Sequence, residues 1–181
     1  MPKRLSRPAE PATNAAAAGA GVEEEDASDG AGPPRSGGSF PIVGVGASAG
    51  GLEAYTDLLK HLAPDTGMGF VLVQHLDPVH ESALTQLLGR VSAMPVHEVT
   101  NDLRVEPNHV YVIPPNTNLS IEAGVLKLQP RETSRLPARS IDFFFESLAA
   151  DQHARAIGVI LSGTASDGTL GLEAIDRKSV V

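Results

Sequence analysis

Three polar residues that could carry out hydrolysis each follow a predicted buried strand. Ser48, His75 and Asp167 come at or just after the ends of apolar runs that begin at residues 42, 69 and 156. A serine hydroxyl becomes a useful nucleophile when a histidine accepts its proton. An aspartate can then fix the imidazole tautomer and stabilise the imidazolium. These residue types therefore predict a serine hydrolase with the chain order Ser, His, Asp.

The segment around Ser48 has the composition of a tight turn between a strand and a helix. Ser48 is the centre of a G-x-S-x-G match, in which such a turn exposes a serine hydroxyl. The unpaired N–H groups at the start of the helix can hold an oxyanion, so we assign that role to the backbone around Ala49 and Gly50. We expect Gly46, Gly50 and Gly51 to allow the turn and a close substrate approach.

Each of the three residues also has a simpler structural explanation. Ser48 and Asp167 could each cap the helix that follows, which is the more frequent role of serine or aspartate at a helix start. His75 could be a partly buried histidine that hydrogen-bonds the backbone. Capping does not require a histidine at a third strand end, so the combination favours the hydrolase.

Strand and helix patterns alternate at both ends of the predicted domain. An apolar run that begins at residue 42, and further runs at 69–74 and 156–161, are followed by helical spacing in residues 52–62, 82–91 and 170–175. Such alternation predicts right-handed crossovers and a parallel sheet, whose strand carboxyl ends share one edge where ligands bind. The expected fold class is α/β, a doubly wound, mostly parallel sheet.

The middle of the chain shows mainly short strand patterns separated by turns. A β-hairpin is predicted from residues 119–121 and 125–128, with Gly124 at positive φ in its turn, and two further short strands from residues 95–99 and 110–113. Residues 129–139 are predicted as an exposed loop. Ser140 is expected to cap the next helix, whose apolar face would contain Ile141, Phe144, Phe145 and Leu148.

Composition excludes several classes of protein. The formal net charge of −8 and the pI of 5.1 argue against a nucleic-acid partner. With no cysteine there is neither a disulfide nor a thiolate zinc site. No apolar run approaches the ~20 residues that span a bilayer, so we expect a cytoplasmic protein without membrane insertion. His75, Asp77 and His80 match no defensible metal spacing, and neither a metal nor a cofactor is expected.

Three parts of the chain are predicted from their composition and residue patterns. Residues 1–39 are a low-complexity leader, rich in Ala, Gly, Pro, Ser and acid, and are expected to be disordered. Residues 40–175 are expected to form one domain, incomplete at its C-terminus. Residues 176–181 are those that read-through into a common sequencing adapter would encode, so we expect a non-native tail.

Four ordered motifs, at residues 44–51, 73–75, 110–115 and 161–168, resemble the catalytic domain of the CheB-type protein-glutamate methylesterases of bacterial chemotaxis. The likeness spans residues 40–175 and is greatest to the form fused ahead of a CheR-type methyltransferase domain. It implies a doubly wound sheet with an antiparallel hairpin. The family's nucleophile, histidine and aspartate fall on Ser48, His75 and Asp167.

The same resemblance implies a reaction and its partners. The family removes methyl groups from glutamate γ-methyl esters on receptor helices, releasing methanol, and some members deamidate glutamine. Methylated receptor helices and a downstream CheR-type methyltransferase domain are the expected partners. Thr164, which stands with Ala165 where many members have Met-Gly, is included with Ala49 and Gly50 in the oxyanion and substrate-binding set.

Two other classes of function remain open. Gly44, Gly46 and Gly50 also fit a loose dinucleotide-binding pattern of a Rossmann-like protein, with Asp77 near the place of a ribose-binding acid. A non-catalytic module that grips carboxylates or methyl esters would keep the same polar strand ends as an anion pocket.

Overall fold

A five-stranded parallel sheet organises the computed structural model, which describes residues 40–48, 50–74, 81–131, 139–162 and 166–179. Neighbouring strands follow the order β3-β5-β2-β1-β8, so the first strand of the chain lies inside the sheet. All the pairings in this sheet are parallel. The strands are β1 (Ile42–Ala47), β2 (Gly69–Gln74), β3 (Val96–Glu98), β5 (Val110–Val112) and β8 (Ala156–Ser162).

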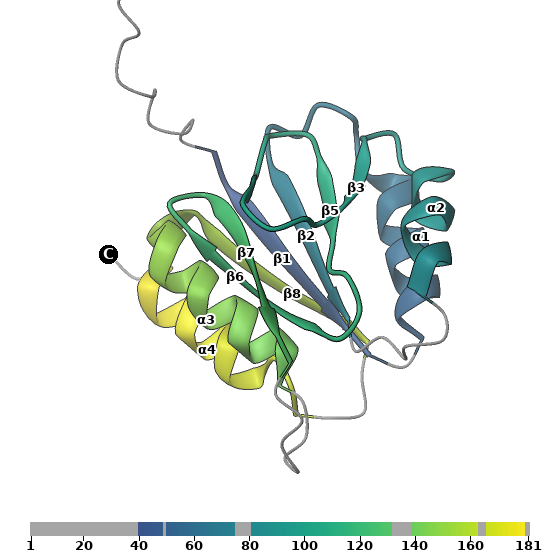
Figure 1. The fold of residues 1–181 in the computed structure, drawn as a ribbon. Helices are drawn as coiled ribbons and strands as arrows, with labels where there is room; N and C mark the ends of the chain where they lie inside the picture. Colours follow the sequence, from purple (N-terminus) through teal and green to yellow (C-terminus); the bar gives the residue numbers. More distant parts are fainter. Residues whose placement is uncertain (1–39, 49, 75–80, 132–138, 163–165, 180–181) are drawn as a thin grey trace, which may run out of the picture. The chain divides into compact units, whose positions relative to one another are not determined.

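Helices cover both faces of this sheet (Figure 1). On one face, α1 (Gly51–His61) and α2 (Glu81–Gly89) pack through Tyr55, Leu59, Leu84 and Leu88. On the other face lie α3 (Ser140–Gln152) and α4 (Thr169–Ser179), with the short 3-10 helix η1 (His153–Arg155) after α3. The α/β fold class with a doubly wound, mostly parallel sheet is confirmed.

A second, antiparallel sheet packs against α3. It contains β4 (Leu103–Arg104), β6 (Thr117–Glu122) and β7 (Val125–Pro130) in the order β4-β7-β6. Ala123 and Gly124 both have positive φ, 50° and 73°, as a two-residue hairpin turn of type I′ requires. The predicted hairpin is confirmed, whereas β4, which is only two residues long, was not predicted.

Two glycines in β1 let α3 lie directly on the sheet. A Cβ at Gly44 would lie 2.7 Å from Phe145 Cε1, and one at Gly46 would lie 2.6 Å from Ile141 Cγ2. Such distances leave no room for a side chain. The expectation that Gly46 forms part of the turn is therefore wrong, because Gly46 lies within β1 and serves helix packing.

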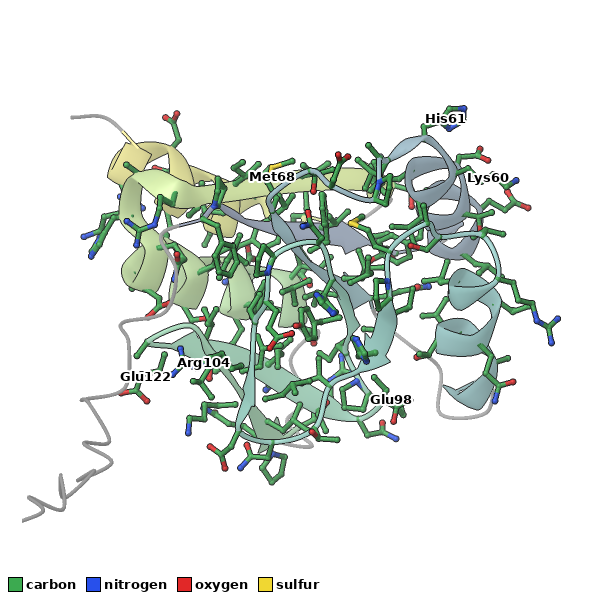
Figure 2. All side chains as sticks on the ribbon, turned by 90° about the horizontal axis from the view of Figure 1, so that it is seen from above. Lys60, His61, Met68, Glu98, Arg104 and Glu122 are labelled. Atoms are coloured by element: carbon green, nitrogen blue, oxygen red, sulfur yellow. The ribbon has the colours of Figure 1, made fainter. Side chains whose placement is uncertain are left out.

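Side chains fill the space between the sheet and the elements on either face (Figure 2). The labelled charged residues and histidine, by contrast, are exposed around the outside of the molecule: Lys60, His61, Glu98, Arg104 and Glu122. None of the helices in the described ranges is both long enough and apolar enough to cross a membrane.

Candidate active site

Ser48 lies directly after β1, in a turn closed by backbone hydrogen bonds. Its N–H donates to Ser162 O at 3.0 Å, and its carbonyl oxygen accepts from Gly51 N at 3.0 Å. Gly50 is left-handed, with φ 79° and ψ 8°, and is the N-cap residue of α1. The N-cap residue is thus a glycine without a side chain, so Ser48 does not occupy the N-cap position that the main alternative for it assumed.

The position of Gly50 is not enclosed by other described residues. None of their atoms lies within 4 Å of the place where a Cβ of Gly50 would stand. Gly51 is buried under the Gln74 side chain, whose Cδ lies 2.9 Å from the corresponding position. A helix N-terminus carries unpaired N–H donors and a partial positive charge, so this end of α1 can receive an anion.

Two buried polar side chains flank the end of β1. Ala47 pairs with Gln74 on one side and with Ser162 on the other. Gln74 Oε1 and Ser162 Oγ have no hydrogen-bond partner within the part of the chain that the structure describes. Polar groups therefore surround the strand end that carries Ser48.

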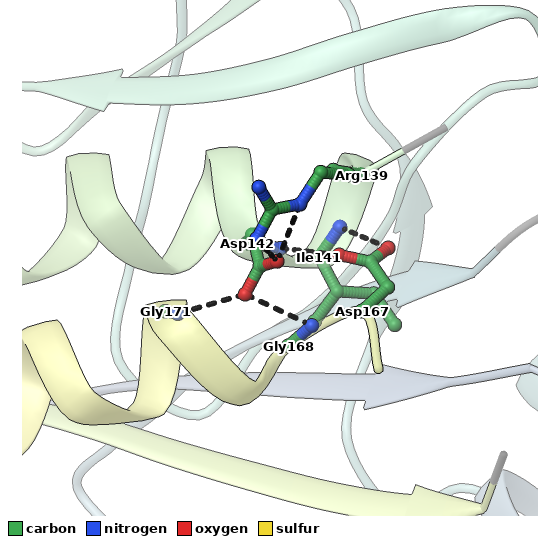
Figure 3. Close-up of polar contacts among 6 residues, drawn as sticks. All are labelled: Arg139, Ile141, Asp142, Asp167, Gly168 and Gly171. Atoms are coloured by element: carbon green, nitrogen blue, oxygen red, sulfur yellow. Dashed lines mark hydrogen bonds and ion pairs between the residues drawn. The ribbon is translucent and has the colours of Figure 1, made fainter. Parts of the chain in front are cut away.

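Asp167 has a well-defined role in the packing of α3. Its Oδ1 accepts from Asp142 N at 2.9 Å and its Oδ2 from Ile141 N at 3.1 Å, so the carboxylate caps α3 (Figure 3). The simpler explanation, that Asp167 caps a helix, thus holds for α3, which is not the helix that follows it in the chain. A carboxylate oxygen has two acceptor sites, so accepting these two N–H groups does not exclude other donors.

The prediction that Ser140 caps α3 is wrong. Ser140 is the first residue of the helix, and its Oγ lies 3.4 Å from Asn118 Oδ1. The preceding residue, Arg139, supplies no side-chain cap. The first-turn N–H groups instead find an acceptor that is distant in sequence but brought close by the packing of α4 on α3.

Asp142 performs the reciprocal task for α4. The residue is 2% exposed, and its Oδ1 accepts from Gly168 N at 3.0 Å and from Gly171 N at 2.8 Å. Its Oδ2 accepts from Arg139 Nε at 3.0 Å and Nη2 at 2.7 Å (Figure 3). Asp167 therefore caps α3, the helix that carries Asp142, and Asp142 caps α4, the helix that follows Asp167.

Sequence reasoning missed Asp142, although a signal was present. Asp142, Phe145 and Ala149 recur at helical spacing, and all three are buried. A carboxylate in register with buried apolar residues needs hydrogen-bond donors, because burial of an unpaired charge is costly. That spacing indicates a carboxylate with a specific partner.

Shared neighbours bring Ser48 and Asp167 to the same region of the sheet edge. The Cβ positions of Gly46 and Gly168 lie 2.6 and 3.0 Å from Ile141 Cγ2, and 2.7 and 2.5 Å from Ile160 Cδ1. Gly46 precedes Ser48 by two residues and Gly168 directly follows Asp167. Two of the three predicted residues thus lie near the carboxyl ends of β1 and β8.

The other predicted site residues, His75, Ala49 and Thr164, lie outside the described residues, as do Asp77 and His80. The roles assigned to them stay predictions. The described ranges contain no group of three or more acidic, histidine or cysteine side chains that could hold a metal ion.

Tyr55 anchors the middle of α1 to the sheet below the site. Its side chain is fully buried, and its hydroxyl lies within hydrogen-bond distance of Val73 O, at 2.9 Å, and of Val45 O, at 3.2 Å. Burial raises the pKa of the Tyr55 hydroxyl well above its usual value. The hydroxyl therefore stays protonated and donates to the carbonyls of β1 and β2.

The doubly wound sheet, with a glycine turn and a serine at the end of a central strand, defines an α/β protein with its candidate site at the carboxyl edge of the sheet. Among proteins of that class, the chain belongs to the CheB methylesterase family, whose model matches residues 43–181.

Relatives and a solved structure agree with this assignment. The chain is 36% identical over 151 residues to a protein-glutamate methylesterase/protein-glutamine glutaminase 2 of Burkholderia pseudomallei (strain 1710b). This match covers 82% of this chain and 44% of the relative. It is 36% identical over 135 residues to a protein of the same name from Xanthomonas oryzae pv. oryzae (strain MAFF 311018), covering 72% and 37%. The chain thus spans less than half the length of these relatives.

The Thermotoga maritima CheB methylesterase catalytic domain is similar in fold. It matches with a TM-score of 0.69 and 26% sequence identity, over 77% of this chain and 76% of that one. The similarity supports the same arrangement of the central sheet and its helices.

Proposed function

We propose that this chain hydrolyses methyl esters of glutamate side chains in chemoreceptor-like signalling proteins, and that it also deamidates glutamine. The observation that supports this best is the position of Ser48. It directly follows β1, precedes the glycine N-cap of α1, and lies on the same sheet edge as Asp167. Its relatives are named for these two reactions.

In the proposed reaction, Ser48 Oγ attacks the ester carbonyl carbon while His75 takes the hydroxyl proton. Backbone N–H groups at Ala49 and Gly50, with Thr164 beside them, stabilise the oxyanion. The bond to the methoxy oxygen breaks, and His75 protonates that oxygen to give methanol. Water then attacks the acyl-enzyme, His75 takes its proton and returns it to Ser48 Oγ, and glutamate is released.

Asp167 is assigned the role of orienting His75 and stabilising the imidazolium. The carboxylate is held by Ile141 N and Asp142 N, and it retains acceptor capacity for an imidazole N–H. Two donors from a packed helix make this carboxylate well suited to hold one orientation.

The substrate in the proposal is a methylated receptor helix. We further propose that a CheR-type methyltransferase domain follows in the full gene product. The relatives are longer than this chain, so their length leaves room for further domains.

A fluorophosphonate probe tests the proposal, because it labels only an activated serine. We expect wild-type chain to be labelled at Ser48, and Ser48→Ala or His75→Ala to lose methanol release from a glutamate γ-methyl ester peptide by up to ~10⁶-fold. Ser120→Ala, on β6, is the matched control and should retain full activity.

Three outcomes would contradict the proposal. Equal labelling of Ser48→Ala would place the reactive group elsewhere. A folded wild-type chain that binds the ester peptide without labelling or turnover would be a binding module. Saturable binding of NAD(P)H, without esterase activity, would support the dinucleotide-binding alternative.

A further inference from the structure

We propose that Asp142 is a positioning residue for the esterase reaction, acting by holding Asp167 in its working orientation; this inference rests on the proposed function. Asp142 lies on α3 and has no assigned contact with substrate. It acts through the crosswise pair of helix caps that joins α3 to the segment carrying Asp167 (Figure 3).

The hydrogen bonds between the two segments form a closed set. Asp167 accepts from two N–H groups at the start of α3, and Asp142 accepts from Gly168 N and Gly171 N at the start of α4. Gly168 is covalently bonded to Asp167, so the bond from Gly168 N to Asp142 fixes the backbone next to the Asp167 side chain. If the Asp142 carboxylate is lost, Gly168 N loses its acceptor, and the backbone that follows Asp167 is then no longer held.

The two helices pack closely at this point. A Cβ at Gly171 would lie 2.5 Å from Phe145 Cβ and 3.1 Å from Asp142 Cα, so the backbones approach closely. This approach places the Asp142 carboxylate within hydrogen-bond distance of Gly168 N and Gly171 N.

Both Asp142 carboxylate oxygens act as acceptors in this role. Its Oδ1 accepts two backbone N–H bonds and its Oδ2 accepts two from the Arg139 guanidinium, so all four donors face acceptor oxygens. An asparagine of the same shape would present an NH₂ group to one of these donor pairs. Asp142→Asn therefore disturbs the pair of caps while changing side-chain volume very little.

Asp151 provides a matched control on the same helix. Its carboxylate likewise accepts from two backbone N–H groups, Ala123 N at 2.5 Å and Gly124 N at 3.1 Å. It lies in the last turn of α3, whereas Asp142 lies in the first. Asp151→Asn thus removes a comparable structural interaction remote from Asp167.

The experiment compares kcat and KM for a glutamate γ-methyl ester peptide, corrected for the folded fraction, in the full chain. We expect Asp142→Asn to lower kcat ~10²-fold, the size expected when a reacting group is misplaced by about 1 Å, with KM within about 2-fold. Asp151→Asn should lower the thermal midpoint but change kcat less than about 2-fold. In an Asp167→Asn background, adding Asp142→Asn should change kcat less than about 2-fold further.

Two results would overturn the inference while leaving the proposed function intact: unchanged kcat in Asp142→Asn, or effects of the two substitutions that multiply in the double variant. If Asp142→Asn fails to fold, Arg139→Gln tests the same point. That variant keeps the carboxylate but removes two of its donors, so kcat should fall several-fold with KM unchanged, and an unchanged kcat would refute the role. A wild-type chain that is neither labelled nor active would instead refute the proposed function itself, and the inference with it.

Discussion

The N-terminus of α1 and those of α3 and α4 are held in opposite ways. At α3 and α4, the first-turn N–H groups are bonded by the carboxylates of Asp167 and Asp142. At α1 the N-cap residue is Gly50, which has no side chain, and the bond from Gly51 N to Ser48 O closes the turn before the helix. The helix is instead anchored in its middle by Tyr55.

The two kinds of helix end serve different purposes: those of α3 and α4 hold the fold together, and that of α1 lies at the candidate active site. Capped termini have their donors occupied, so they can join elements but cannot bind an incoming anion. The terminus whose N-cap residue has no side chain is the one beside Ser48, and a helix N-terminus of this kind can stabilise a developing oxyanion. Anchoring α1 through Tyr55 supplies rigidity without occupying that end.

The sharpest test of this contrast compares two left-handed glycines, one next to each type of terminus. Gly168 has φ 97°, and a Cβ there would lie 2.5 Å from Ile160 Cδ1. Gly50 has φ 79°, and a Cβ there would have no atom of the other described residues within 4 Å. We expect Gly168→Ala to cost about 2–4 kcal/mol from backbone strain and overpacking. Gly50→Ala should cost only the strain, about 1–2 kcal/mol.

Urea unfolding followed by circular dichroism measures both values, with wild type as the reference. Equal losses in the two variants would contradict the contrast, because they would mean that the α4 terminus is no more tightly enclosed than that of α1. A larger loss in Gly50→Ala would reverse it.

Tyr55→Phe tests the anchor of α1. The substitution removes one hydroxyl from a fully buried site, so it should lower the free energy of unfolding by about 1 kcal/mol. Because the anchor holds α1 beneath the turn, esterase activity at Ser48 should also fall. Unfolding in urea and methanol release are the two measurements, and a variant as stable as wild type would show that the hydroxyl contributes nothing.

The smallest expected effect is a pH dependence on the alkaline side. The folded-state pKa of Tyr55 is raised by burial above its unfolded value of about 10. The stability that this contributes is complete below pH ~10 and is lost as the pH rises above it, because the unfolded chain releases the proton more readily.

Between pH 8 and pH 10, the free energy of unfolding of wild type should fall by about 0.4 kcal/mol more than that of Tyr55→Phe. Tyr111, whose pKa burial also raises, titrates in both proteins, so the difference between them isolates Tyr55. Parallel pH curves for the two proteins would argue against a protonated, buried hydroxyl at this position.

Strand and helix periodicity was sufficient to predict much of the fold. Residues 69–74 were predicted as a buried apolar run, and they form β2 at these bounds, whereas β1 begins at the predicted Ile42 but continues through Gly46, which was expected in the turn. The turn at Gly124 was also predictable, because a positive φ there has a local cause. Local patterns fail for β4, whose two residues are too few to show a period.

The caps of the candidate site could not be predicted from local sequence. Ser140 has the right residue type and position to cap α3, yet Asp167, which is 26 residues from Ile141, does so. That choice depends on how α4 packs on α3, and therefore on contacts such as that of Gly171 with Phe145. Ser48 was predictable because the glycines around it mark its turn directly in the sequence.

Because β1 pairs with β8, the candidate active site can form only after β8 has been synthesised. More than a hundred residues separate these neighbours along the chain, and the bond from Ser48 N to Ser162 O joins their ends. During synthesis, β1 therefore leaves the ribosome long before its second partner exists. Until β8 emerges, the edge of β1 that pairs with it stays unpaired and exposed to chaperones and to other nascent chains.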